Sequence, residues 1–343
     1  TVARFVQGRV FPAHDSTTLD IGPSLCYEAI ARAAGHNVAA EDVEDRIAEV
    51  GDVGDVAAAY DFGGQQGLAA FAGGDRDGLT VGEVEAELRE LAAAEGSGSQ
   101  DHKVDLLFGL FNRCASDEAR YLARLVLSEM RIGVGEGTVR DAAAAAFEIP
   151  VAAVERALQV TNDYGLVATV ARDEGEAGLA DRRLAVGRPV QAMLAQAGTV
   201  SEAVDAWETV AVETKYDGAR VQVHYDGESV ALFSRNMEDV TDALPEVVAF
   251  VEANLSVPAI LDGEVVAVDA DGDPLPFQEV LRRFRRKHDV AKAREEVEVQ
   301  LWAFDCLHAD GDDLLDVSLR ERHDRLTTIL DSDTSTLTVT GDP

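Results

Sequence analysis

The feature that most constrains the fold is a change in hydrophobic periodicity near residue 186. Before this point apolar residues recur every three or four positions, which is typical of amphipathic helices. We therefore predict an all-helical N-terminal domain over residues 1–186 and a second domain over residues 187–343. The predicted helical segments are Leu25–Ala33, Val81–Leu91, Val104–Phe111, Ala119–Leu127, Val139–Phe147 and Val151–Val160.

The second domain mixes strand-like and helix-like patterns. Between two of the predicted strands lies Asp226-Gly227, a dipeptide typical of tight β-hairpins. We therefore predict an α+β domain built on an antiparallel sheet. Its predicted strands are Thr209–Thr214, Ala219–Tyr225, Ser229–Ser234, Ala259–Val268 and Val297–Leu307, and its predicted helices are Leu244–Leu255, Phe277–Lys287 and Arg320–Leu330.

Two loops of the first domain precede helix starts, at Gly96–Gln100 and Arg131–Gly137. Free backbone N–H groups at such starts suit a phosphate, although two flexible turns would give the same pattern. The nearby cations Lys103 and Arg131 favour a surface that binds the DNA backbone. Asp101, Ser116 and Thr138 are the N-caps that the sequence predicts for three of the helices.

The charge balance is strongly acidic, with 64 acidic against 30 basic residues and a formal net charge of −34. In molar salt the Debye length falls to about 3 Å, so the repulsion within such a surface is screened. We interpret the composition as adaptation to high salt, with an acidic interaction protein as the alternative. Cys26, Cys114 and Cys306 are isolated, which indicates neither a zinc site nor a disulfide framework and favours a reducing cytoplasm.

Lysine is rare in this sequence, which contains Lys103, Lys215, Lys287 and Lys292. Lys215 lies in Glu213-Thr-Lys-Tyr-Asp-Gly-Ala-Arg220, between two predicted strands. Further polar or aromatic residues at the predicted strands are Arg235, Glu264, Phe304 and Asp305. A nucleotide needs an aromatic stacking face, cations for its phosphates and carboxylates for sugar or metal, and this set supplies all three.

Four motifs of the second domain resemble those of ATP-dependent DNA ligases. They are Lys215-Tyr-Asp-Gly-Ala-Arg220, Phe233-Ser-Arg-Asn-Met-Glu-Asp-Val-Thr241, Leu261-Asp-Gly-Glu264 and Trp302-Ala-Phe-Asp305. The first half resembles the helical DNA-binding domain of the archaeal and eukaryotic replicative type. The segments that carry this second resemblance are Gly96–Gln100, Glu118–Leu122 and Arg131–Glu136. Together with the composition, the resemblance suggests a halophilic archaeal origin.

The resemblance implies a reaction in which Lys215 attacks the α-phosphate of ATP and carries AMP as a covalent adduct. The AMP would pass to the 5′-phosphate of a nick, and the 3′-hydroxyl would then displace it. Glu213 would lie at the adenine edge, Phe304 would stack on the base, and Glu264 would contact ribose or a metal ion. Arg220 and Arg235 would hold phosphate and ribose.

The same resemblance implies ATP and Mg²⁺ as cofactors and nicked double-stranded DNA as the partner, in replication, repair and recombination. A sliding clamp is a further expected partner, and we expect a cytoplasmic monomer without a membrane span. One dense basic cluster, in the predicted helix Phe277–Lys287, either contacts DNA phosphates or pairs with nearby glutamates. The DNA contacts proposed there are Arg282, Arg283, Arg285 and Arg286.

The family pattern continues with a Glu-Gly-x-x-x-Lys motif, a Trp-x-Lys-x-Lys motif and an OB-fold domain, none of which is in this sequence. We therefore expect a fragment whose nucleotidyltransferase domain is incomplete and whose sealing activity alone is absent or weak. Two alternatives stay open: another covalent nucleotidyltransferase such as an RNA ligase, and a DNA-binding or clamp-docking module whose second half is an inactive scaffold.

Overall fold

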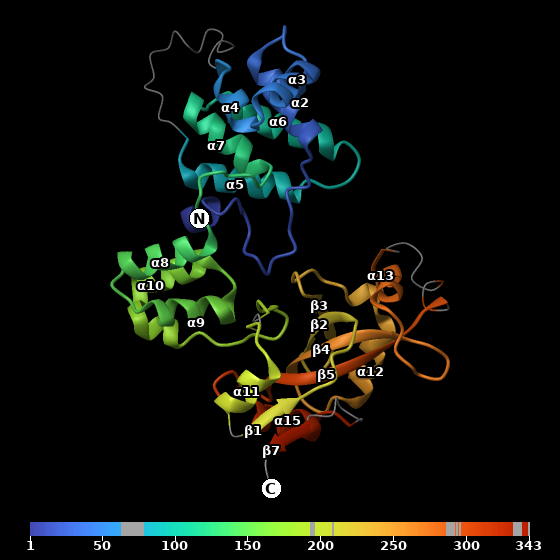
Figure 1. Ribbon diagram of the computed structural model, residues 1–343. Helices are drawn as coiled ribbons and strands as arrows, with labels where there is room; N and C mark the ends of the chain where they lie inside the picture. Colours follow the sequence, from blue (N-terminus) through green and yellow to red (C-terminus); the bar gives the residue numbers. More distant parts are fainter. Residues whose placement is uncertain are drawn as a thin grey trace. The chain divides into compact units, whose positions relative to one another are not determined.

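The computed structural model describes residues 1–62, 79–192, 196–207, 209–285, 292, 294, 296–331 and 338–341. The chain divides into two compact units, and each is described by itself (Figure 1). Unit 1 comprises Thr1–Leu158 and Asp163–Ala180, and unit 2 comprises Gln159–Asn162 and Asp181–Pro343. The domain boundary near residue 186 remains a prediction. No helix in the described parts of the chain is long and apolar enough to cross a membrane.

Unit 1 consists of helices and connecting segments in its described residues, which confirms the all-helical prediction. Its helices are α1 (Val2–Phe5), α2 (Pro23–Ala34), α3 (Ala40–Val50), α4 (Val53–Ala58), α5 (Val81–Ala93), α6 (Ser99–Phe111), α7 (Ser116–Val126), α8 (Glu136–Ala146), α9 (Val151–Thr161) and α10 (Tyr164–Ala180). The six predicted helical segments do not include α1, α3, α4 or α10. One apolar core joins α2 to α7, and a second joins α8 to α10.

The contact between α4 and α7 shows how closely these helices pack. A Cβ atom at Gly54 would lie 2.7 Å from the Arg120 carbonyl oxygen and 2.6 Å from Arg124 Nε. Because real Cβ atoms do not approach backbone oxygen this closely, a larger residue at position 54 would force the helices apart. Glycine is required here for space.

The predicted N-caps are wrong for three helices. The observed N-caps are Gly98 for α6, Ala115 for α7 and Gly135 for α8. Asp101, Ser116 and Thr138 instead lie inside the helices. At α7 the N–H group of the N-cap residue is satisfied by a side chain, since the Glu118 carboxylate accepts a hydrogen bond from Ala115 N at 2.7 Å. Asp101 still lies in the first turn of α6, where its charge favours the helix dipole.

Unit 2 contains a five-stranded antiparallel sheet with the strand order β3-β2-β4-β5-β6 (Figure 1). The strands are β2 (Ala219–Tyr225), β3 (Val230–Ser234), β4 (Ala259–Val268), β5 (Glu298–Ala309) and β6 (Asp312–Asp313). A separate two-stranded sheet pairs β1 (Thr209–Val212) with β7 (Thr338–Gly341). The remaining elements are α11 (Val200–Ala206), η3 (Thr241–Ala243), α12 (Pro245–Asn254), α13 (Phe277–Arg285) and α15 (Leu319–Ile329). These elements confirm the predicted α+β fold class.

The two faces of the five-stranded sheet differ in character. Val221 and Val223 of β2 belong to an apolar core with side chains of α12, α13 and α15. Since side chains alternate along a strand, Arg220, Gln222 and His224 lie on the opposite face. The sheet therefore has one face that builds the core and one that carries polar groups.

Residues 187–190, which precede α11 and β1 in the chain, cover one end of the polar face. Gln222 makes two hydrogen bonds to the Val190 backbone, accepting from its N at 3.0 Å and donating to its O at 2.6 Å. His224 Nδ1 accepts from Gly187 N at 3.1 Å. Val190 also packs against Ile260 of β4 in a small apolar cluster. The polar face is thus closed at this end and carries the candidate site residues at the other.

Candidate active site

The register of the sheet brings distant site residues together. Arg220 of β2 lies opposite Glu264 of β4, and Glu264 lies opposite Trp302 of β5. Residues directly opposite in an antiparallel pair have Cβ atoms about 4.5–5.5 Å apart. Phe304 belongs to the same group, because the Arg220 guanidinium lies 5.7 Å from its ring centroid. Three motifs that are far apart in the sequence therefore meet on one face.

Lys215 lies at the edge of this group, in an irregular segment between β1 and β2. Its side chain is exposed, and its charge acts on the Glu264 carboxylate. The segment approaches β4 so closely that a Cβ at Gly218 would lie 2.4 Å from the Val265 carbonyl oxygen. Only glycine fits this close approach, which explains the last residue of Lys-x-Asp-Gly in physical terms.

Asp217 connects the same segment to a helix. Its Oδ2 accepts a hydrogen bond from Phe277 N at 3.3 Å, at the first residue of α13. Free N–H groups at a helix start need such acceptors. Asp217 and Gly218 therefore hold the segment from the side that follows Lys215.

Glu264 is half-buried beside Lys215. Burial raises the pKa of its carboxyl above the ordinary value, while the charge of Lys215 and a hydrogen bond from Gly218 N lower it. Because burial is the largest of these effects, the net direction is upward. A carboxylate with a raised pKa beside a cation is typical of a functional site as well as of a structural ion pair.

Arg220 is held by a residue that the sequence did not single out. Its Nε donates to Asp262 Oδ1 at 3.0 Å, and its Nη2 donates to Asp262 Oδ2. The Asp262 side chain is only 5% exposed, so burial raises its pKa although Arg220 opposes the shift. Since Arg220 also covers one face of Phe304, a base stacked on Phe304 would use the other face.

A second charged pair continues this network on β5. Arg322 of α15 donates to both oxygens of Asp305, at 2.7 and 3.0 Å. Arg322 has no local signal in the sequence, because it lies in α15 and its partner Asp305 lies in β5. Asp262 does have a local signal, because it lies two residues before Glu264 and strand alternation places both on one face.

Two other predicted nucleotide contacts stay outside this network. Glu213 is exposed in the irregular segment. Arg235 is exposed in the turn after β3, and no hydrogen bond joins its side chain to another described residue. The turn itself is ordered by Ser234, whose Oγ accepts from Asn236 N and Glu238 N, both at 3.3 Å. Arg235 is therefore presented on a defined turn with its donors available.

The burial of two proposed DNA contacts requires a correction. Lys103 is 3% exposed and donates through Nζ to the Leu19 carbonyl oxygen at 2.9 Å. Arg283 is 1% exposed and donates to the carbonyl oxygens of Val297 at 2.9 Å and Ala243 at 3.0 Å. Both cations stabilise the interior of their units, so neither presents its charge to a phosphate.

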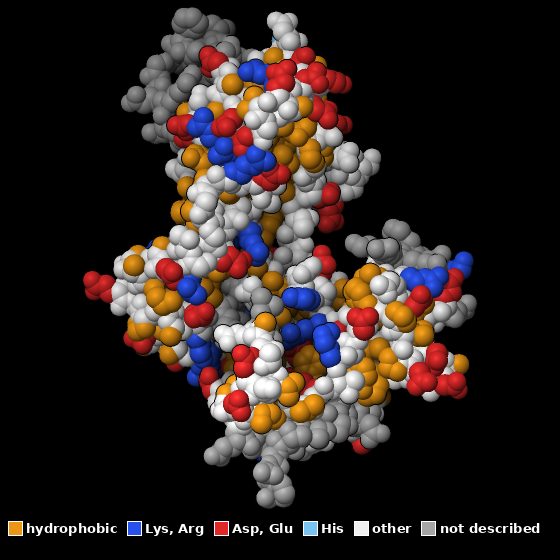
Figure 2. All heavy atoms as spheres, in the orientation of Figure 1, with side chains coloured by type: hydrophobic (Ala, Val, Ile, Leu, Met, Phe, Trp, Pro, Cys, Tyr) orange, Lys and Arg blue, Asp and Glu red, His pale blue; other side chains and the backbone are white. Residues whose placement is uncertain are grey.

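The other proposed DNA contacts differ in their surroundings. Arg131 is exposed, donates to the Gly51 carbonyl oxygen at 2.6 Å and pairs with Glu129 at 2.8 Å. Arg282 is exposed and pairs with Glu279 at 2.7 Å. Arg286 and the side chain of Arg285 lie outside the described residues. Acidic side chains appear at several separate places on the face shown in Figure 2.

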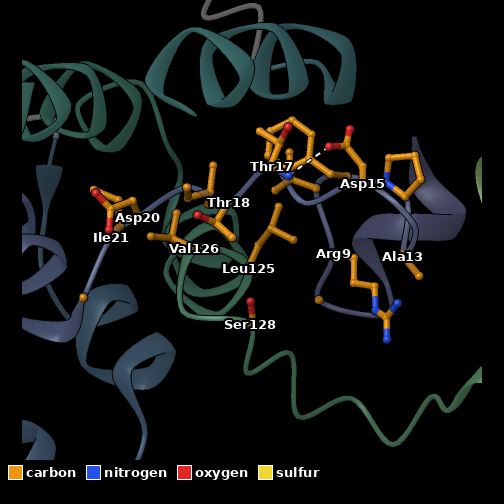
Figure 3. A pocket seen from close by; sticks show the side chains of 16 residues that line it. Arg9, Ala13, Asp15, Thr17, Thr18, Asp20, Ile21, Leu125, Val126 and Ser128 are labelled. Carbon is orange, nitrogen blue, oxygen red and sulfur yellow. Dashed lines mark hydrogen bonds between the residues drawn. The ribbon is translucent and has the colours of Figure 1, made fainter. Parts of the chain in front are cut away.

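A cavity of about 590 Å³ lies in unit 1, between the extended segment Gly8–Gly22 and the end of α7 (Figure 3). In Figure 3 Asp15 accepts a hydrogen bond from Thr17 N at 2.9 Å, which forms a local turn at the rim. None of the predicted nucleotide contacts lines this cavity. The candidate site is instead the polar face of the sheet in unit 2.

Comparison with known families covers almost the whole chain. Residues 1–144 match the family described as "DNA ligase N terminus", and residues 192–341 match "ATP dependent DNA ligase domain". The chain belongs to the ATP-dependent DNA ligase family. The second match contains every residue of the candidate site, which agrees with the resemblance seen in the motifs.

Individual relatives agree with this assignment. The chain is 73% identical to a DNA ligase of Haloarcula marismortui over 335 residues, covering 97% of this chain and 60% of the relative. It is 71% identical to a DNA ligase of Natronomonas pharaonis over 343 residues, covering 100% of this chain and 63% of the relative. The chain thus spans about three-fifths of the length of these relatives. Both come from halophilic archaea, which agrees with the high-salt interpretation.

A solved structure, titled "mycobacterial DNA ligase D complexed with ATP and MES", is 30% identical to this chain. The match covers 38% of this chain and 41% of the solved chain, with a TM-score of 0.31. Membership of an ATP-dependent family implies use of ATP.

Proposed function

We propose that the whole protein seals nicks in duplex DNA through a covalent lysyl-AMP intermediate. The observation that carries this proposal is the convergence of Lys215, Glu264, Arg220 and Phe304 at one face of a sheet in a chain of the ligase family. An aromatic face, a cation and a carboxylate within reach of an exposed lysine supply what nucleotidyl transfer to an amine requires.

The first step would form a bond between Lys215 Nζ and the α-phosphorus of ATP, while the bond from that phosphorus to pyrophosphate breaks. The amine must be neutral to attack, and its proton leaves to solvent or to a nearby base. Glu213 would contact the adenine edge, and Phe304 would stack on the base. Arg220 and Arg235 would hold phosphate and ribose. Arg235 suits this role because its donors are available.

The later steps would use DNA as substrate. An oxygen of the 5′-phosphate at the nick attacks the phosphorus of the adduct, and the Lys215 amine leaves. The 3′-hydroxyl then attacks the 5′-phosphate, and AMP leaves as the strand is sealed. Among the predicted DNA contacts whose side chains the structure describes, Arg131 and Arg282 are exposed, and these two would bind DNA phosphates. Each already pairs with a carboxylate in the protein, and contact with DNA would replace that pair by a contact with a phosphate. The affinity from such phosphate contacts would fall steeply as the salt concentration rises.

We propose Glu264 as the protein ligand of Mg²⁺. Within the described residues, no three His, Cys, Asp or Glu side chains are grouped to hold a metal ion. Mg²⁺ in nucleotide enzymes is commonly held by one or two carboxylates and the substrate phosphates, so a single carboxylate is compatible with it. When bound there, the ion would neutralise charge on the triphosphate.

We also propose a cytoplasmic monomer that acts in replication, repair and recombination and is recruited by a sliding clamp. The three isolated cysteines support a reducing compartment. Light scattering at high KCl tests the monomer, and a pull-down with the clamp from the same organism tests the recruitment.

The proposed reaction is tested with α-labelled ATP, Mg²⁺ and full-length protein at high KCl. We expect a labelled protein adduct that forms with wild type, is absent in Lys215→Ala, and is discharged by nicked DNA. An adduct that persists in Lys215→Ala would overturn the proposal. Preferential discharge by nicked RNA would favour an RNA ligase, and DNA binding without any adduct would favour a non-catalytic binding module.

A further inference from the structure

Two aromatic side chains connect the Lys215 segment to the sheet. The rings of Tyr216 and Trp302 are stacked, with centroids 4.5 Å apart and planes inclined by 24°. Tyr216 directly follows Lys215, and Trp302 lies on β5 opposite Glu264. The stack therefore joins the residue beside the proposed nucleophile to β5, which lies between β4 and β6 in the sheet.

We propose that this stack positions Lys215, so that Tyr216 and Trp302 are positioning residues for the transfer of AMP. This inference rests on the proposed function, since it takes Lys215 as the nucleophile. Neither ring needs to contact the reacting atoms. Their role is to fix the backbone from which the Lys215 side chain extends.

The segment has few other anchors near Lys215. No hydrogen bond joins Glu213, Thr214 or Lys215 to another described residue, and all three are exposed. On the preceding side the chain enters from β1, whose last residue Val212 is 52% exposed. An irregular exposed segment without hydrogen bonds is mobile unless side chains hold it. The Tyr216 ring is the anchor closest to the nucleophile.

The anchors that follow Lys215 are two and three residues away. Asp217 accepts from the first N–H of α13, and Gly218 N donates to Glu264. They fix where β2 begins, but they leave the rotation of the Lys215 backbone open. The ring of Tyr216 restricts that rotation because it must lie flat against the indole.

Trp302 is suited to act as the fixed partner. It is part of β5, which pairs with β4 along ten register positions from Ala259 to Val268. Its indole Nε1 is buried and has no hydrogen-bond partner among the described residues. The orientation of the indole therefore does not depend on a hydrogen bond of its own, and packing against neighbours such as Tyr216 must set it.

This arrangement offers matched control variants. Tyr216→Phe keeps the ring and removes only a hydroxyl, and Trp302→Phe keeps an aromatic ring and removes the unpaired N–H. Tyr216→Ala and Trp302→Ala each remove one half of the stack. A displacement of a reacting group by about 1 Å costs on the order of 100-fold in rate, which sets the scale of the expected effect.

The experiment measures single-turnover formation of the labelled adduct by full-length protein, at saturating ATP and high KCl. For Tyr216→Ala and Trp302→Ala we expect the rate constant to fall about 10- to 100-fold. The dissociation constant of ATP, measured in a Lys215→Ala background, should change less than about threefold, because the stack is not a nucleotide contact. Both Phe variants should retain a rate within about threefold of wild type.

A double variant tests the pair itself. If both rings act as one unit, Tyr216→Ala with Trp302→Ala should be no slower than the more affected single variant. Losses that multiply would overturn the proposal, as would a wild-type rate in Tyr216→Ala or a weakened ATP affinity at unchanged rate. Trp302→Leu replaces Trp302→Ala if the latter fails to fold, as judged by circular dichroism.

Failure of the positioning role can be distinguished from failure of the proposed function. If wild type forms no adduct, or if Lys215→Ala keeps it, the nucleophile assignment is wrong. If wild type forms the adduct through Lys215 and Tyr216→Ala is equally fast, only the positioning role is wrong.

Discussion

Lys103 of unit 1 and Lys215 of unit 2 are two of the four lysines in the sequence, and the fold places them in opposite surroundings. Lys103 is buried in α6, donates to the Leu19 carbonyl oxygen at 2.9 Å and lies 3.4 Å from Asp20 Oδ2. Lys215 is exposed, with no hydrogen bond to a described residue. The fold uses the neighbours of Lys215, and not its amine, to hold the chain in place.

The difference shows how a lysine with a structural role can be distinguished from a reactive lysine. A buried ammonium must keep its hydrogen bonds, because an unpaired buried charge is costly. Such a group is also out of reach of a substrate, as Lys103 is at 3% exposure. An exposed amine on a segment held by the residues that follow it remains available, and substitutions at the two lysines test this difference.

The largest expected effect is the loss of the adduct in Lys215 variants. Lys215→Ala removes the amine, and Lys215→Arg keeps a charge that stays protonated, so neither can attack phosphorus. Adduct formation should fall by more than about 1,000-fold in both. Stability should change by less than about 0.5 kcal/mol because the side chain is exposed. Substantial adduct in Lys215→Arg would contradict this assignment.

Next in size is the loss of stability in Arg283→Met, which removes a buried cation of unit 2. Arg283 pairs with Glu246, and it also donates to two backbone carbonyl groups. Breaking a buried ion pair on one side costs about 3–5 kcal/mol, since the other charge stays behind. The matched control is the adjacent and exposed Arg282→Met, for which urea unfolding should show a change below about 0.5 kcal/mol. Equal losses of unfolding free energy in the two variants would show that burial does not distinguish Arg283 from Arg282.

A smaller loss of stability is expected for Lys103→Met. The substitution keeps the apolar stem but leaves the Leu19 carbonyl oxygen without its donor, at a cost of about 1–3 kcal/mol. Adduct formation should remain within about threefold of wild type at temperatures where the variant is folded. Loss of the adduct in a folded Lys103 variant would remove the distinction between the two lysines.

Acid should destabilise unit 2 through His224, the residue that holds the Gly187 backbone. Burial, assisted by the neighbouring His308, lowers the pKa of His224 from 6.5 to about 3. The unfolded chain therefore binds the proton first, and stability is lost as the pH falls from about 6.5 towards 3. The loss should reach about 2 kcal/mol at pH 5. Urea unfolding of His224→Leu should lose this dependence, whereas the exposed His36→Gln should keep it.

The sequence predicted those elements whose signals are local. Ala219–Tyr225 and Ala259–Val268 were predicted with the observed bounds, because alternation and the Asp226-Gly227 turn are encoded in adjacent residues. The six helical segments of unit 1 were found for the same reason. The acidic α3 was missed because its charged residues dominate a short pattern in which only Val43 is buried.

The site was predictable in its parts but not in its contacts. Motif order identified Lys215, Arg220, Glu264 and Phe304, but their partners depend on strand register. The stack of Tyr216 on Trp302 joins positions that are far apart in the sequence. Burial depends on tertiary packing in the same way, so the sequence patterns do not separate the buried Lys103 and Arg283 from surface cations.

The most direct test of the central claim is to locate AMP on the protein. Full-length protein is incubated with ATP and Mg²⁺ at high KCl, and the modified peptides are identified by mass spectrometry. We predict AMP on Lys215 and on none of Lys103, Lys287 and Lys292. AMP on any of these three lysines with Lys215 unmodified would contradict the account.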